Sequence, residues 1–104
     1  MLRAAVIAIC LAVFPAAALA AGKTHAVRIE GMKFNPERLE VAAGDTVVWT
    51  NKDLVPHTVT AGAAKVESGE LAPSKSWRFV AKKKGEMPYI CRLHPVMKGV
   101  LVVK

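Results

Sequence analysis

Apolar and polar residues alternate along most of the chain after residue 25, and this period of two is typical of β-strands with one buried face. A clear example is 76–80, in which Trp77 and Phe79 fall on the same face. The segment 46–50 is rich in β-branched and aromatic residues, which favour strands. We predict strands at residues 26–30, 32–34, 38–41, 46–50, 57–60, 76–80, 87–91 and 100–103.

Turn-forming residues separate these segments, as at Asn35-Pro36 and Gly44-Asp45. No helical period follows residue 21, and residues 66–73 have no strong period of either kind. Short strands with frequent turns predict one all-β domain, a sandwich or a barrel. The last strand, 100–103, lacks alternation, so we expect it to be buried on both faces.

Residues 1–20 have the features of a secretory signal peptide. Arg3 gives a positive start, residues 4–14 form an apolar run, and Ala18-Leu19-Ala20 is a small-residue cleavage signal. The run is too short to span a membrane. We therefore expect a periplasmic domain of residues 21–104 without a membrane span. Cys10 leaves with the leader, and the loss of Arg3 lowers the formal charge from +7 to +6.

The candidate chemistry lies close to the C-terminus, where Cys91, His94 and Met97 follow one another at a spacing of three residues. Upstream, His57 offers a second imidazole. One thiolate, two imidazoles and a weak thioether are the donors of a blue copper site. Coordination would also explain a single cysteine in an exported domain, because a metal deprotonates and protects the sulfur. We predict one type 1 copper ion bound by His57, Cys91, His94 and Met97.

Weaker interpretations of these residues stay open. Structural zinc is one, although such sites use closed cysteine and histidine sets and methionine is a poor zinc ligand; an unligated free thiol at Cys91 is another. Met87 alternates with Tyr89 and Cys91, so we assign it to the core, and Met32 lies far upstream. We expect His25 to be an exposed histidine near a frayed terminus.

Taken together, these segments resemble the cupredoxin family, most closely its plastocyanin/amicyanin branch. The resemblance covers nearly all of residues 26–104 and is carried by residues 32–36, 43–51, 56–57 and 88–99. It implies a two-sheet Greek-key β-sandwich, one copper ion at one end held by the four residues named above, and soluble electron transfer. Asn51 resembles the family asparagine that ties the upstream ligand loop to the cysteine loop. Two positions depart from the branch: Arg92 replaces a small hydroxyl residue, and Thr58 replaces an asparagine.

The sequence therefore predicts an electron carrier that cycles between Cu(II) and Cu(I), and not an enzyme. The alternative is a copper carrier or buffer without a redox role, which would favour exposed, exchangeable ligands. We expect His57 to be the buried imidazole. We expect His94 to reach the surface within an apolar patch formed by Val55, Pro56, Pro95 and Val96.

The predicted partners are redox proteins that bind transiently and present an acidic surface, since Lys98 and Arg92 lie near the metal loop and Lys82, Lys83 and Lys84 form a basic turn. The same triple lysine is equally consistent with a solvated turn that plays no part in docking. Nucleic acid is not expected, because the basic residues are spread out without interleaved aromatic residues. We expect a monomer.

Overall fold

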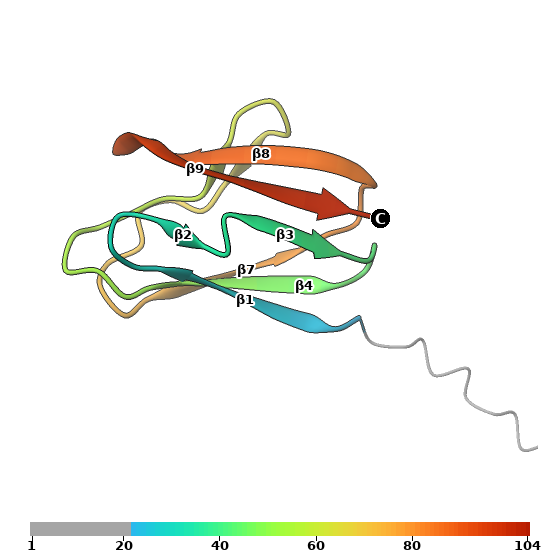
Figure 1. Cartoon of the computed structure of the whole chain (residues 1–104), viewed down its shortest axis with the longest axis horizontal. Helices are drawn as coiled ribbons and strands as arrows, with labels where there is room; N and C mark the ends of the chain where they lie inside the picture. Colours follow the sequence, from blue (N-terminus) through green and yellow to red (C-terminus); the bar gives the residue numbers. More distant parts are fainter. Residues whose placement is uncertain (1–21) are drawn as a thin grey trace, which may run out of the picture.

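The computed structural model describes residues 22–104, and the expected leader at 1–20 lies outside the described residues. The described chain forms strands and no helix, and the strands build two sheets (Figure 1). The first sheet has the order β2 (Phe34–Asn35), β1 (Thr24–Ile29), β4 (Thr46–Asn51), β7 (Ser76–Val80). The second has the order β3 (Arg38–Val41), β9 (His94–Val103), β8 (Gly85–Cys91), β5 (Thr60–Ala61), β6 (Val66–Glu67).

Both sheets are mixed. The strands β1 and β4 pair in parallel, as do β3 and β9, whereas the other pairs are antiparallel. Parallel neighbours need a crossover connection, and here the chain passes through the other sheet between them. The prediction of an all-β sandwich is confirmed.

The core lies between the sheets and follows from the alternation in the sequence. In β4, Val47, Trp49 and Asn51 are buried while the residues between them are half-exposed. The ring of Tyr89 from β8 packs edge-on against Phe34 and Trp49 of the opposite sheet, with centroid distances of 4.7 and 5.5 Å. Burial raises the pKa of Tyr89 to about 12, so its phenol stays neutral.

A close approach of side chain to backbone fixes β8 against β9. The ring of Tyr89 lies over Gly99 so closely that a Cβ atom at position 99 would meet the ring at 2.4 Å. Only glycine fits there, and overpacking of this kind costs about 1–3 kcal/mol when it can be accommodated at all.

Three local predictions were wrong. The last strand begins at His94 rather than at residue 100, and Val100 and Val102 are half-buried because β9 packs the core with one face only. Residues 57–60 form an isolated bridge and then the short strand β5, and β6 lies in the segment without a clear period. In both places tertiary pairing decides the backbone over one or two residues, which a periodic pattern cannot register.

His25 was also predicted wrongly. It lies half-buried in β1, and its Nε2 is 2.8 Å from Asp45 Oδ2. Asp45 also accepts the backbone N–H groups of Lys23 and Ala42. These contacts tie the N-terminal strand to the turn before β4.

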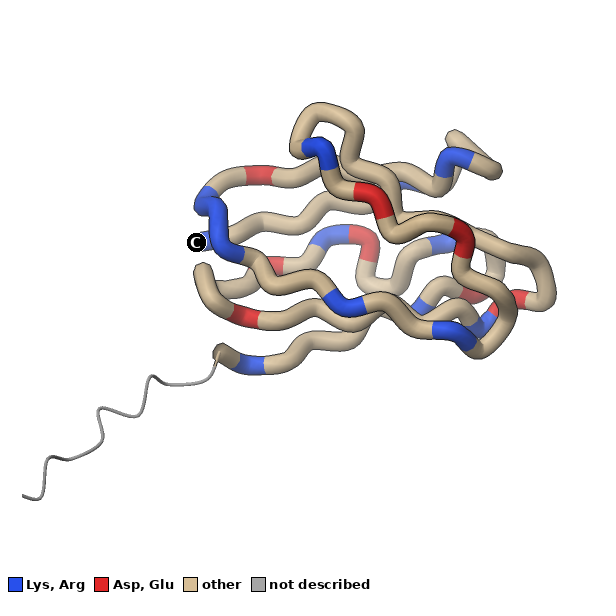
Figure 2. Tube along the Cα trace, turned by 180° about the vertical axis from the view of Figure 1, so that it is seen from behind, with Lys and Arg blue, Asp and Glu red and all other residues tan. Residues whose placement is uncertain are grey.

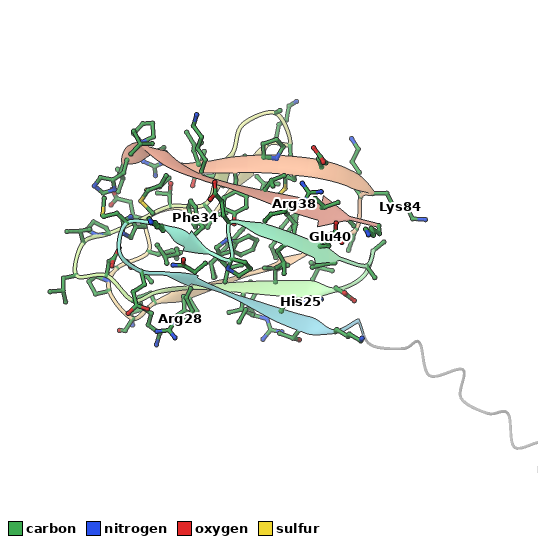
Figure 3. The ribbon with its side chains drawn as sticks, in the orientation of Figure 1. His25, Arg28, Phe34, Arg38, Glu40 and Lys84 are labelled. Atoms are coloured by element: carbon green, nitrogen blue, oxygen red, sulfur yellow. The ribbon has the colours of Figure 1, made fainter. Side chains whose placement is uncertain are left out.

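The two ends of the sandwich differ in what they carry. The strand β8 runs from Gly85 to Cys91, so Lys82, Lys83 and Lys84 precede the end opposite the predicted ligands, about 20 Å away at 3.4 Å per residue. Figure 2 shows basic positions gathered beside the C-terminus, and Lys84 extends from that end in Figure 3. Between residues 22 and 104 the structure contains no helix long and apolar enough to cross a membrane.

Candidate metal centre

A tight turn brings two of the predicted ligands together. Strand β8 ends at Cys91 and β9 begins at His94, and these two residues are partners across the turn, next to a β-bulge at Ile90 and Cys91. Cys91 Sγ lies 3.7 Å from His94 Nδ1. The cysteine is fully buried and is a free thiol, whereas His94 is half-buried.

His57 reaches the same point from the other side. An isolated bridge to Leu71 holds its backbone, with both N–H groups donating across the pair at 3.1 and 2.7 Å. The imidazole is completely buried, and Nδ1 lies 3.6 Å from Cys91 Sγ. One ligand atom from each of His57, Cys91 and His94 lies within 4.8 Å of the others. The structure therefore brings three of the four predicted ligands together.

Met97 occupies β9 three residues after His94 and is 2 % exposed. Its axial role stays a prediction, to which a buried position near the start of β9 is suited. Met87 is buried in the middle of β8 and belongs to the core, as predicted, whereas Met32 is 41 % exposed.

A residue that the sequence analysis missed orients His57. The Nε2 atom of the imidazole is 2.8 Å from Asp53 Oδ2. Because a carboxylate only accepts hydrogen bonds, Nε2 carries the proton and Nδ1, which faces the thiol, keeps its lone pair. A second-sphere carboxylate that fixes the tautomer of a ligand histidine is common at metal sites. The signal in the sequence was an aspartate four residues before the histidine.

Asp53 is itself held by the β1–β2 turn. The backbone N–H groups of Gly31 and Met32 donate to its two carboxylate oxygens at 2.7 and 2.9 Å. Both residues have positive φ, at 65° and 59°, which turns their successive N–H groups toward one anion. Burial raises the pKa of Asp53, but the N–H of Met32, the hydrogen bond to His57 and the N–H of Gly31 outweigh it, and the pKa lies below its usual value.

The thiol has its own hydrogen bond. The backbone N–H of Thr58 donates to Cys91 Sγ at 3.3 Å, and the N–H of Arg92 donates back to Thr58 Oγ1 at 2.9 Å. Thr58 therefore ties the two ligand segments together. The role expected for Asn51 was wrong: its amide donates to the carbonyls of Val55 and Leu71 and accepts from Asp53 N, which shapes the loop before His57 instead.

The residues of the predicted apolar patch are all exposed. Val96 is 88 % exposed, Val55 is 41 % exposed, and Pro56 and Pro95 are exposed as well, as such a patch requires. Leu54, at 93 % exposed, extends it. The turn with three lysines lies at the other end of the sandwich and takes no part in this patch.

The donors fit copper better than other common metals. A soft thiolate and thioether beside two imidazoles suit a metal that alternates between a soft monovalent and a harder divalent state. Closed structural zinc sites are built from cysteine and histidine without a thioether. Among residues 22–104, no other group of three or more histidine, cysteine or carboxylate side chains is placed to hold an ion.

A two-sheet β-sandwich with one thiolate and two imidazoles converging at one end defines a class of small proteins with a single metal centre. A family model described as a cupredoxin-like domain matches residues 3–103. The chain belongs to the cupredoxin-like family, as its sequence motifs predicted.

Similar proteins place the chain within the family. It is 37 % identical over 119 residues to amicyanin-alpha of Methylorubrum extorquens, a match that covers 99 % of this chain and 100 % of that protein. It is 32 % identical to amicyanin of Paracoccus denitrificans, covering 86 % of this chain and 72 % of that one. The structure of a Cu(I) form of an amicyanin variant superposes with a TM-score of 0.74 at 30 % identity, covering 81 % of this chain and 85 % of the other.

Proposed function

We propose that this protein is a periplasmic blue copper protein that carries single electrons between redox partner proteins and is not an enzyme. His57, Cys91, His94 and Met97 would hold one copper ion. The observation that carries the proposal is the convergence of the His57, Cys91 and His94 donor atoms within 4.8 Å of one another. Bound copper would supply a one-electron couple between Cu(II) and Cu(I).

The protein's own contribution is to hold the donors in place. Cys91 is fixed by the β8–β9 pairing, His57 by the bridge to Leu71 and by Asp53, and Met97 by its burial in β9. Donors that are locked by packing and by second-sphere hydrogen bonds change little when the charge of a bound ion changes. Such rigidity favours rapid electron transfer.

The half-buried edge of His94 is the proposed route for the electron. Around it lies the apolar patch of Leu54, Val55, Pro56, Pro95 and Val96. A small apolar surface suits a transient redox complex, which buries less than about 1,200 Å². The exposed Lys98 next to the patch favours an acidic partner surface.

Buried donors favour electron transfer over copper delivery. His57, Cys91 and Met97 are each at most 2 % exposed, so an acceptor protein could not replace them without opening the site. Spectroelectrochemistry of the copper-loaded protein distinguishes the two functions. Repeated one-electron reduction and oxidation with copper retained is the result we expect. Loss of the ion to a Cu(I) chelator in each reduced phase would support the carrier function instead.

We also propose that residues 1–20 direct export and are removed, leaving a monomeric domain of residues 21–104. Mass spectrometry of the protein recovered from the periplasm should find an N-terminus at Ala21. Light scattering should find one chain per particle. Retention of the full-length chain in the cytoplasm would contradict the proposed location.

A further inference from the structure

A closed ring of hydrogen bonds lies beside the cysteine and joins four side chains. Thr58 Oγ1 is 2.8 Å from Thr60 Oγ1, and Thr60 Oγ1 donates to Glu67 Oε1 at 3.1 Å. The same carboxylate oxygen accepts Arg92 Nε at 2.8 Å. The backbone N–H of Arg92 donates to Thr58 Oγ1 at 2.9 Å and closes the ring.

The chemistry of the groups fixes the direction of every bond. Glu67 as a carboxylate only accepts, so the Thr60 hydroxyl proton points to it. Thr60 must then accept from the Thr58 hydroxyl, and Thr58 in turn accepts from the Arg92 N–H. Successive hydroxyl donors that end on an anion polarise one another. The carboxylate of Glu67 therefore strengthens Thr58 Oγ1 as an acceptor two bonds away.

The carboxylate is well suited to this position. Its second oxygen accepts the backbone N–H of Gly69 at 2.8 Å, which anchors it to the loop after β6. Burial raises the pKa of Glu67, but this N–H, Arg92 and Thr60 outweigh it, and the pKa lies below its usual value. The Glu67 side chain therefore remains a carboxylate at neutral pH.

The ring touches both ligand segments of the metal centre. Thr58 directly follows His57, and Arg92 directly follows Cys91. The N–H of Thr58 donates to Cys91 Sγ, while its hydroxyl accepts the N–H of the peptide that Cys91 begins. Fixing that peptide fixes the sulfur relative to the Thr58 N–H.

We propose that Glu67 and Arg92 are positioning residues, which hold the Cys91 sulfur on the Thr58 N–H through Thr58 and Thr60 and thereby raise the reduction potential of the metal centre. This inference rests on the proposed function. A donor to the thiolate withdraws electron density from it and favours the reduced metal, because hydrogen bonding around the cysteine sulfur tunes the potential of such sites. Loosening the ring should lower the potential.

The pair is more than an isolated surface ion pair. The side chains of Arg92 and Glu67 are 44 % and 42 % exposed, and an exposed ion pair alone contributes little to stability. Here, however, the pair ends a chain whose inner member, Thr58, is completely buried. Its effect should therefore appear in the geometry of the sulfur more than in global stability.

The test compares Glu67→Ala, Arg92→Ala and the double variant with the wild-type protein loaded with copper. We expect each single change to shift the oxidised-to-reduced equilibrium about threefold toward the oxidised state, roughly 28 mV for a one-electron couple at 59 mV per tenfold. The double variant should shift no further than either single one, because both remove the same ring. Thr60→Val, which removes the hydroxyl link while both charges stay, should give the same shift.

The matched control is Arg38→Ala, which removes a similarly exposed arginine on β3 that pairs with Glu86 on β8 at 3.6 Å. It should leave the potential unchanged. Equal shifts in the control, additive shifts in the double variant, or an unchanged potential in Thr60→Val would each overturn the proposal.

A second measurement needs no metal. In the metal-free protein, hydrogen exchange at the Arg92 amide should accelerate at least threefold in Glu67→Ala and Thr60→Val and stay constant in Arg38→Ala. Unchanged exchange would overturn the ring. If the wild-type protein formed no blue copper site at all, the proposed function would fail while the exchange result still decided whether the ring holds Arg92.

Discussion

Two histidine–aspartate pairs stand at opposite ends of this sandwich with the same contact distance. His57 Nε2 lies 2.8 Å from Asp53 Oδ2, and His25 Nε2 lies 2.8 Å from Asp45 Oδ2. Both aspartates also accept two backbone N–H groups. The pairs nevertheless serve different purposes, because their surroundings differ.

The difference lies at the other ring nitrogen. In His57 it faces Cys91, and a second imidazole from His94 completes the group. His25 is not part of any such group within residues 22–104, and its side chain is 24 % exposed beside the N-terminal strand. The free nitrogen of His57 faces other donor side chains, which suits a metal ligand, whereas the His25–Asp45 pair only ties strands together.

The largest effect on copper affinity should come from removing one of the two histidines and not the other. We expect His57→Ala to weaken copper binding by more than about 100-fold, since even the loss of an outer partner costs about 10- to 100-fold. His25→Ala should leave copper affinity unchanged. Competition with a Cu(II) chelator measures both. Equal losses in the two variants would contradict the distinction between the ends.

The two aspartates should also differ in their effect on copper affinity and reduction potential. Asp53→Asn removes the charge behind His57 and should lower Cu(II) affinity about 10- to 100-fold. Because the carboxylate favours the oxidised metal, the reduction potential should rise. The matched change Asp45→Asn should leave the potential and the visible spectrum as they are, and voltammetry of both variants checks this.

At the end of the sandwich away from the predicted ligands, acid should reduce stability by protonating Asp45. The hydrogen bond from His25, followed by the N–H of Ala42, holds the pKa of Asp45 below its usual value despite burial. A carboxyl group whose pKa is depressed by folding stabilises the protein above the unfolded value and loses that contribution as pH falls through the folded value. The free energy of unfolding of the metal-free protein, measured in urea, should therefore decrease below about pH 4. In Asp45→Asn this decrease should be smaller. An equally steep fall in the variant would contradict the assignment.

The smallest expected effect concerns the lysines at the two ends. Lys98 lies on β9 between Met97 and Gly99, whereas Lys84 lies about 20 Å from the ligand turn along β8. At 0.1 M salt the Debye length is about 10 Å, so the distant charge is screened. Lys98→Ala should slow reduction by hexacyanoferrate(II) about twofold, and Lys84→Ala should not. Stopped-flow kinetics would show the reverse order if the basic turn steered the anion.

The fold was predictable because alternation survives wherever a strand has one buried face. Strand β4 shows this at Val47 and Trp49. The wrong predictions concern segments whose backbone is set by pairing with another segment over one or two residues. Glu67 lies in a two-residue strand, and His57 is held by a single bridge. Neither length allows a period to appear.

The candidate ligands Cys91, His94 and Met97 could be predicted because they follow one another at a spacing of three residues. The hydrogen bonds around them were missed, because most of these join segments that lie far apart in the sequence. Asp53 accepts the N–H groups of Gly31 and Met32, and the Cys91 sulfur accepts the N–H of Thr58. The partners in these hydrogen bonds are 21 to 33 residues apart in the sequence. Asn51 was misassigned because a resemblance gives the residue type and not its hydrogen-bond partners.

The most direct test of the central claim is the optical and EPR spectrum of the purified protein after one equivalent of Cu(II). We expect an intense thiolate-to-copper band in the visible region and a narrow copper hyperfine splitting. Both should disappear in Cys91→Ser and persist in Met87→Leu, which changes a core methionine only. A colourless product, or a weak band with ordinary tetragonal splitting, would contradict the assignment of Cys91 as a copper ligand.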